Sequence, residues 1–191
     1  MKHLIFFFLV LISCSKAESQ QLNTLGIPQE RILEIRDYIK GKEYNQELAV
    51  FINFKIPSGK YRYFIYNLKN NTIVQQAVVS HGSGSVIPKS DALKFSNVEG
   101  SYQSSLGKYA IGESYIGKFG KAYRLAGLDA TNSNAMQRAI VLHSYGCIPD
   151  TESKTPVCLS LGCPMLSVNA FKETAKYIDQ STKPMILYAF Y

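Results

Sequence analysis

A cysteine and a histidine in the C-terminal part of the chain have the residue types and the setting for nucleophilic chemistry. The apolar run "RAIVLHSYGC" (138–147) leads into His143, and "CLSLGCPM" (158–165) places Cys163 directly after Gly162. A thiol becomes a useful nucleophile when an imidazole takes its proton, and backbone N–H groups can then hold the oxyanion formed on the attacked carbonyl. These residues therefore predict acyl-group chemistry, with Cys163 as nucleophile, His143 as base, and the amides of Gly162 and Cys163 as the oxyanion hole.

Two other cysteines decide whether Cys163 is free to react. Cys147 and Cys158 bound a polar segment, and a disulfide between them would close a 12-residue loop, worth roughly 3 kcal/mol in the chain-entropy model. Two alternatives stay open: a zinc site of three cysteines and His143, whose spacing lacks the short Cys-x₂₋₄-Cys knuckle, and an inert buried Cys163 beside a histidine satisfied in the core. We expect neither a resident metal nor a cofactor.

The first residues of the chain predict export. Lys2 is followed by nine consecutive apolar residues, 4–12, a length typical of a signal peptide and too short to span a bilayer. The four residues that end at Cys14 resemble a bacterial lipobox, so we assign residues 1–13 to a lipoprotein signal peptide and Cys14 to lipidation. The alternative is ordinary cleavage after Ala17, with Cys14 a chance cysteine in the discarded signal.

Composition favours a single globular domain with a basic surface. The 191 residues are 46% hydrophobic and carry a net charge of +7; without Lys2, 20 basic residues face 14 acidic ones, or +6. Such a charge suits an anionic partner such as cell wall or an anionic lipid surface. Export argues against nucleic acid.

Periodicity predicts a mostly β (α+β) chain with two or three short helices. We divide the mature chain into a tether with an N-terminal helix, 14–45, and a catalytic domain, 46–191. Pro28 opens the first helix, which places three isoleucines on one face, and a second helix is capped by Ser167. The expected strands, in chain order, lie within 48–56, 61–68, 72–80, 106–115, 121–128, 139–143 and 185–191. The first three form an antiparallel meander, and 139–143 is expected to be a central strand covered on both faces.

Several segments together resemble the L,D-transpeptidase family of peptidoglycan enzymes, in the branch of murein L,D-transpeptidase catalytic domain proteins. The resemblance runs from about Leu48 to Tyr191. The segments that carry it are "INFKIPSGKYRYFIYNL", "SHGSGS" (80–85), "FSNVEGSYQSSLGKY" (95–109), "YIGKFGKAYRLAGLD" (115–129), "NAMQRAIVLH" (134–143) and "SLGCP" (160–164). Their number and order make the signal specific.

The resemblance implies a β-sandwich or barrel and a cysteine acyl transferase. Cys163 would attack the carbonyl of the third residue of a stem tetrapeptide, release D-alanine and form a thioester, which a neighbouring amine resolves into a 3→3 cross-link. Water as the acceptor would make the enzyme an L,D-carboxypeptidase. His143 would be held by a backbone carbonyl, and a carbapenem would acylate Cys163. The location implied is the periplasm of a bacterial envelope.

The resemblance also indicates the substrate-binding residues. Near the cysteine, however, this chain lacks residues that the family carries. The candidates are His81, Arg138, Tyr145 and Ser160, although His81 could instead brace its loop, and Arg138 could be structural. Leu159 occupies the place of an arginine in the branch, and Leu161 and Met165 occupy those of a histidine and an arginine in better-known members. Carboxylate binding must therefore come from elsewhere. A non-catalytic peptidoglycan-binding lipoprotein is the alternative from a different functional class. The absence of the local cysteine motif argues against a papain-like protease.

Overall fold

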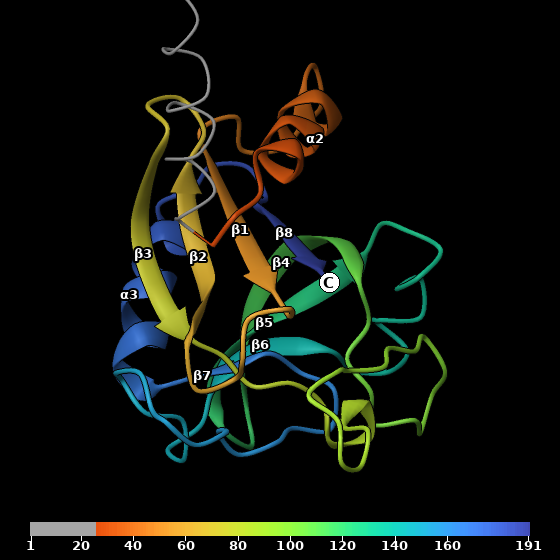
Figure 1. Ribbon diagram of the computed structural model, residues 1–191. Helices are drawn as coiled ribbons and strands as arrows, with labels where there is room; N and C mark the ends of the chain where they lie inside the picture. Colours follow the sequence, from red (N-terminus) through yellow and green to blue (C-terminus); the bar gives the residue numbers. More distant parts are fainter. Residues whose placement is uncertain (1–25) are drawn as a thin grey trace, which may run out of the picture.

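Within residues 26–191, a mixed sheet of eight strands is curved into a nearly closed barrel (Figure 1). The computed structural model describes residues 26–191, so the predicted signal peptide and Cys14 lie outside the described residues. The mostly β fold with short helices is therefore confirmed. The elements are α2 (Gln29–Ile39), β1 (Leu48–Asn53), β2 (Tyr61–Asn67), β3 (Thr72–Val78), β4 (Gly107–Gly117), β5 (Gly120–Gly127), β6 (Val141–Ser144), β7 (Met165–Leu166), α3 (Val168–Asp179) and β8 (Ile186–Phe190), with a 3-10 turn at Ser83–Ser85.

The sheet order is β3-β2-β1-β8-β4-β5-β6-β7, and the C-terminal strand lies in its middle. The antiparallel β1–β2–β3 meander is confirmed. β8 pairs in parallel with β1 and antiparallel with β4. The strand predicted to be central, β6, instead lies next to the edge, between β5 and the two-residue β7. Its residues Val141, Leu142 and His143 are nevertheless all buried, because helix α3 and the chain that returns to β7 cover it.

β1 shows why an uninterrupted apolar run can still be a strand. Side chains alternate between the two faces of a strand: Val50 and Ile52 enter the cluster inside the barrel, whereas Ala49 and Phe51 enter a second cluster outside it. β2 and β8 divide their residues between the same two clusters. Since both faces of these strands are covered, no polar alternation is needed.

Helix α2 supplies the cover of the outer cluster. It begins after Pro28, and its residues Ile32, Ile35 and Ile39 are buried against β1, β2 and β8. After the helix, Gly41 adopts a left-handed φ of 71°, the conformation that glycine allows at a helix C-terminus. In Figure 1, α2 lies at the upper end of the molecule, away from β6 and β7.

Helix α3 covers the other side of the barrel and follows directly after β7. The Ser167 hydroxyl accepts a hydrogen bond from the Ala170 amide, which is the predicted N-cap. Phe171, Ala175 and Ile178 pack into the cluster inside the barrel. Neither described helix is long and apolar enough to cross a membrane.

We expect Ile35→Ala to destabilise the fold by about 2–5 kcal/mol, because it leaves a cavity between α2 and the sheet. Leu33→Ala on the same helix is the matched control: Leu33 is 47% exposed, so its truncation should change the free energy of unfolding by no more than about 0.5 kcal/mol. Urea unfolding followed by circular dichroism measures both. Equal effects of the two substitutions would contradict the docking of α2.

Candidate active site

Cys163 is the free cysteine of the described chain, and it lies against the start of β6. Cys147 and Cys158 form a disulfide with a Cα–Cα distance of 6.2 Å. The Cys163 sulfur accepts a hydrogen bond from the Val141 N–H at 3.4 Å, and its S–H faces the carbonyl oxygen of Ala139 at 3.7 Å. The thiol is therefore held by backbone groups at one point of the sheet.

His143 lies on β6, two residues beyond the contact with the thiol. Its Nδ1 is 3.0 Å from the carbonyl oxygen of Ser144. Because a carbonyl oxygen only accepts hydrogen bonds, Nδ1 carries the proton and Nε2 keeps a lone pair for another proton. A backbone carbonyl therefore orients the imidazole, and no carboxylate of residues 26–191 takes part.

The β6–β7 pairing sets the cysteine segment alongside β6, near His143. His143 pairs with Met165 in the parallel ladder, and Cys163 precedes Met165 by two residues. Two residues of a strand span roughly 6–7 Å. Neither ring nitrogen of His143 is hydrogen-bonded to Cys163 in the structure; proton transfer would require the thiol to turn from the Ala139 carbonyl, and such contacts often tighten only when substrate binds.

The electrostatics of the site favour a neutral thiol and a neutral imidazole at rest. Burial raises the pKa of the Cys163 thiol, while the Val141 N–H and the positive charge of Arg138 oppose that rise. Burial lowers the pKa of His143, and the hydrogen bond to Ser144 opposes that change. These shifts therefore favour a neutral thiol beside a neutral imidazole over a preformed thiolate–imidazolium pair.

Arg138 lies behind the nucleophile and is held by the protein itself. It donates to the carbonyl oxygen of Ser96 at 2.8 Å, to the Ser105 hydroxyl at 3.2 Å and to the carbonyl oxygen of Gln103. It has no carboxylate partner among the ion pairs of the described residues. Its charge is therefore available to the thiolate, although its donors are engaged with backbone and hydroxyl oxygens.

The two amides expected to form the oxyanion hole differ in the structure. Gly162 adopts a φ of 122°, which favours glycine, and a Cβ there would lie 3.0 Å from the carbonyl oxygen of Gln103. Its N–H donates to the Ser160 hydroxyl at 3.1 Å. The Cys163 N–H has no acceptor among the described residues. The Cys163 amide is therefore the one open to an incoming oxyanion.

The "SHGSGS" and "SSLGKY" segments both lie against the cysteine segment. The Ser80 hydroxyl donates to the Cys163 carbonyl at 3.3 Å, and the Ser104 hydroxyl lies 3.4 Å from the carbonyl oxygen of Gly162. Gly82 must be glycine here, since a Cβ would lie 2.1 Å from the carbonyl oxygen of Tyr102. Segments far apart in the sequence thus form one support around the nucleophile.

The candidate substrate-binding residues divide into buried and exposed ones. His81 and Ser160 are each 5% exposed, and the Ser160 amide donates to the His81 carbonyl at 2.9 Å. Arg138 is half-buried, whereas Tyr145 is exposed. Tyr145 therefore offers the most accessible surface of the four.

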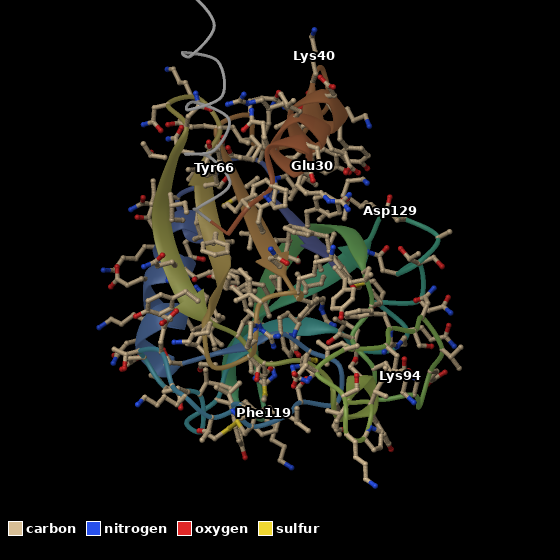
Figure 2. The ribbon with its side chains drawn as sticks, viewed as in Figure 1. Glu30, Lys40, Tyr66, Lys94, Phe119 and Asp129 are labelled. Atoms are coloured by element: carbon tan, nitrogen blue, oxygen red, sulfur yellow. A yellow bond between two sulfur atoms is a disulfide. The ribbon has the colours of Figure 1, made fainter. Side chains whose placement is uncertain are left out.

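Phe119 is a residue of the site that sequence reasoning missed. It comes from the turn between β4 and β5, and its ring stacks on His143 at 5.3 Å with an interplanar angle of 19°. It also meets Tyr145 edge to face. Figure 2 shows Phe119 at the lower end of the molecule, opposite Glu30 and Lys40 of the α2 end. The only sequence signal was its position inside a family-like segment.

A metal centre has no support in residues 26–191. No group of three or more histidine, cysteine or acidic side chains among them could hold an ion. Two residues of the zinc alternative, Cys147 and Cys158, are joined in the disulfide.

Comparison with known proteins bears first on the fold. Similar solved structures include a variant of the helical cell shape determining protein Pgp2 from Campylobacter jejuni, with 14% identity over 85% of this chain and 56% of that one and a TM-score of 0.50. Others are L,D-transpeptidases from Mycobacterium smegmatis (12% identity, 76% and 59% coverage, TM-score 0.44) and Xylanimonas cellulosilytica (11%, 75% and 60%, 0.40). The chain thus spans 56% to 60% of the length of these three structures.

The family assignment rests on a sequence model rather than on these distant structures. No curated protein matches the chain. The model of the L,D-transpeptidase catalytic domain, by contrast, matches residues 24–190. Because that match covers nearly the whole chain, the protein belongs to the L,D-transpeptidase catalytic domain family.

Proposed function

We propose that the protein is a cysteine-dependent acyl transferase that acts on peptidoglycan stem peptides, forming 3→3 cross-links with release of D-alanine. The observation that carries the proposal is the arrangement on β6: a free Cys163 thiol bonded to the Val141 amide, two residues from a His143 whose Nδ1–H is held by the Ser144 carbonyl. Family membership supports the same chemistry.

In the proposed first step, Nε2 of His143 takes the Cys163 proton while the sulfur attacks the carbonyl carbon of the third stem residue. A C–S bond forms, and negative charge develops on the carbonyl oxygen beside the Cys163 N–H. When the carbonyl re-forms, the C–N bond to D-alanine breaks and His143 gives its proton to the leaving amine. The product is a thioester on Cys163.

In the proposed second step, an amine from a neighbouring stem peptide attacks the thioester. His143 accepts a proton from that amine, the C–S bond breaks, and the sulfur leaves and regains a proton. Each step forms one bond to the acyl carbon and breaks another, so no cofactor is needed. Water in place of the amine would give the L,D-carboxypeptidase outcome.

The remaining residues of the site have supporting roles in this proposal. Arg138 is a positioning residue, since its donors hold the backbone behind Gly162 and its charge favours the thiolate. Ser160 braces the cysteine segment through the Gly162 amide. Exposed Tyr145 contacts the substrate beside Phe119.

We further propose that the protein works in the periplasm of a bacterial envelope, attached by a lipid on Cys14. A hydrophobic leader and a lipobox-like sequence support this location. The basic net charge suits an anionic wall polymer. The proposed partners are therefore peptidoglycan stem peptides and a membrane, and not nucleic acid.

An L,D-carboxypeptidase and a non-catalytic peptidoglycan-binding lipoprotein are the alternatives to this proposal. Purified protein incubated with disaccharide tetrapeptide separates the possibilities by mass spectrometry. Cross-linked dimer with free D-alanine supports the transpeptidase, tripeptide with D-alanine supports the carboxypeptidase, and unchanged substrate supports a binding protein. A mass shift at Cys163 on addition of a carbapenem is an independent check of the nucleophile.

We expect Cys163→Ala and His143→Ala each to lower turnover by at least ~10²-fold, since one removes the nucleophile and the other the proton carrier. The release of D-alanine measures the effect. Thr182→Ala, at an exposed position outside the site, should keep parental turnover. Full activity of either site variant would show that the assignment is wrong.

We expect alkylation of Cys163 by iodoacetamide to accelerate with pH, with a midpoint above that of an ordinary cysteine thiol. The reason is that burial raises the thiol pKa and lowers that of His143, so the thiolate–imidazolium pair is disfavoured at rest. Intact-mass measurements between pH 5 and 10 give the profile. A rate that is already maximal near pH 6 would indicate a preformed ion pair instead.

We expect the exported protein to incorporate a labelled fatty acid in bacterial cells, and Cys14→Ser to abolish the label, because the lipid would be attached to that sulfur. Cys163→Ser is the matched control and should stay labelled. Ordinary cleavage after Ala17 would instead leave the parent unlabelled, with an intact mass that begins at Glu18.

A further inference from the structure

Arg62 is a buried cation with no counter-ion in the part of the chain that the structure describes. It lies on β2 with 1% of its surface exposed. Its guanidinium donates to the carbonyl oxygens of Val79, at 2.8 and 3.0 Å, and Ile56, at 3.2 Å, and its Nη2 lies 2.8 Å from Nδ1 of His81. Among the described residues, no carboxylate pairs with it. Such a charge is costly to bury, so its retention calls for a reason.

The positive charge persists at neutral pH. Burial lowers the pKa of Arg62 to about 9, which is still two units above pH 7. The carbonyl dipoles of Val79 and Ile56 stabilise the guanidinium but do not cancel its charge. The loop that carries His81 therefore lies in a positive potential.

Arg62 also sets the tautomer of His81. A guanidinium has only donors, so Nδ1 of His81 must accept and the ring proton resides on Nε2. Burial and the Arg62 charge lower the pKa of His81 to about 4. The His81 ring therefore stays neutral at neutral pH, and its Nε2–H is a fixed donor.

That donor is free to meet a ligand. The contacts of the described residues give Nε2 of His81 no acceptor. The buried side-chain polar atoms without partners in this part of the chain are Oε1 of Gln29 and the hydroxyl of Tyr63, so Nε2 of His81 is not sealed from solvent. His81 as a whole residue is 5% exposed, the same fraction as His143, whose Nε2 must meet the reacting groups in the proposed function.

The backbone that carries this donor is bonded to the cysteine segment. The His81 carbonyl accepts from the Ser160 amide at 2.9 Å, three residues before Cys163. The preceding residue, Ser80, donates to the Cys163 carbonyl and accepts from the Met165 amide at 3.0 Å. The Arg62–His81 pair is thus linked by adjacent backbone to the cysteine segment.

We propose that the Arg62–His81 pair is a carboxylate-binding subsite that holds the terminal carboxylate of the donor peptide. This assignment rests on the proposed function. It names a carboxylate-binding group for a chain in which Leu159 and Met165 occupy the places of the family's arginines. The Nε2–H of His81 donates to a carboxylate oxygen, and the buried Arg62 supplies the positive potential. A neutral carboxamide at the same place gains the hydrogen bond but not the charge interaction.

The experiment uses the Cys163→Ala protein, so that binding is measured without turnover. Isothermal titration compares a stem tetrapeptide that ends in a free carboxylate with the same peptide ending in a carboxamide. We expect the carboxylate to bind about 10-fold tighter or more, as is typical of a charge-assisted hydrogen bond. In His81→Leu this preference should fall below about 3-fold.

Two further variants separate recognition from folding and from overall charge. His81→Gln can accept from Arg62 through its oxygen and donate outward through its nitrogen, so it should keep most of the preference. Lys172→Gln removes an exposed positive charge on α3 and should keep all of it. Circular dichroism verifies that each variant is folded.

Equal binding of the two peptides to the parent, or an unchanged preference in folded His81→Leu, would overturn the subsite. Turnover of the Cys163-containing protein is scored separately. Turnover without a carboxylate preference leaves the proposed function standing and refutes the subsite. A carboxylate preference without turnover supports the subsite and refutes the acyl transfer.

Discussion

The short parallel ladder between β6 and β7 is the constraint on which the site depends. Two residue pairs, His143 with Met165 and Ser144 with Leu166, return the chain to β6 after the excursion that follows it. This return places the Cys163 sulfur on the Val141 amide. So short a ladder needs support, and the Ser80 hydroxyl provides it by bridging the Cys163 carbonyl and the Met165 amide. The Cys147–Cys158 disulfide restrains the same excursion.

Two arginines held by backbone carbonyls, one half-buried and one buried, are a second feature of the structure. Arg138 and Arg62 each donate to backbone carbonyls and lack a carboxylate partner among the described residues. Internal ion pairing would neutralise their charges, whereas carbonyl dipoles only stabilise them. The charges consequently remain available to anions that form or bind beside the cysteine segment. This arrangement suits a reaction in which a thiolate and an oxyanion develop near a peptide carboxylate.

Local sequence pattern was enough to predict those elements whose burial follows from the spacing of their own residues. The isoleucines of α2 and the Ser167 cap of α3 were predicted because period and capping are local properties. The place of β6 in the sheet was predicted wrongly. An apolar run indicates that both faces of a strand are buried, but it does not say whether other strands, a helix or a loop cover them. Phe119 was missed because stacking on His143 depends on the fold of the β4–β5 turn, which brings together residues 24 positions apart.

The sequence by itself determined the chemical types, a cysteine after glycine and a histidine at the end of an apolar run, together with the family-like segments and the helix and strand periods. Only the tertiary structure decided which donors and charges meet those groups. It engaged the Gly162 amide with Ser160, turned the thiol toward Ala139, and placed Arg62 against His81. The physical reason is that hydrogen bonds, burial and electrostatic potential depend on distances between segments remote in the chain, and residue order alone does not contain those distances.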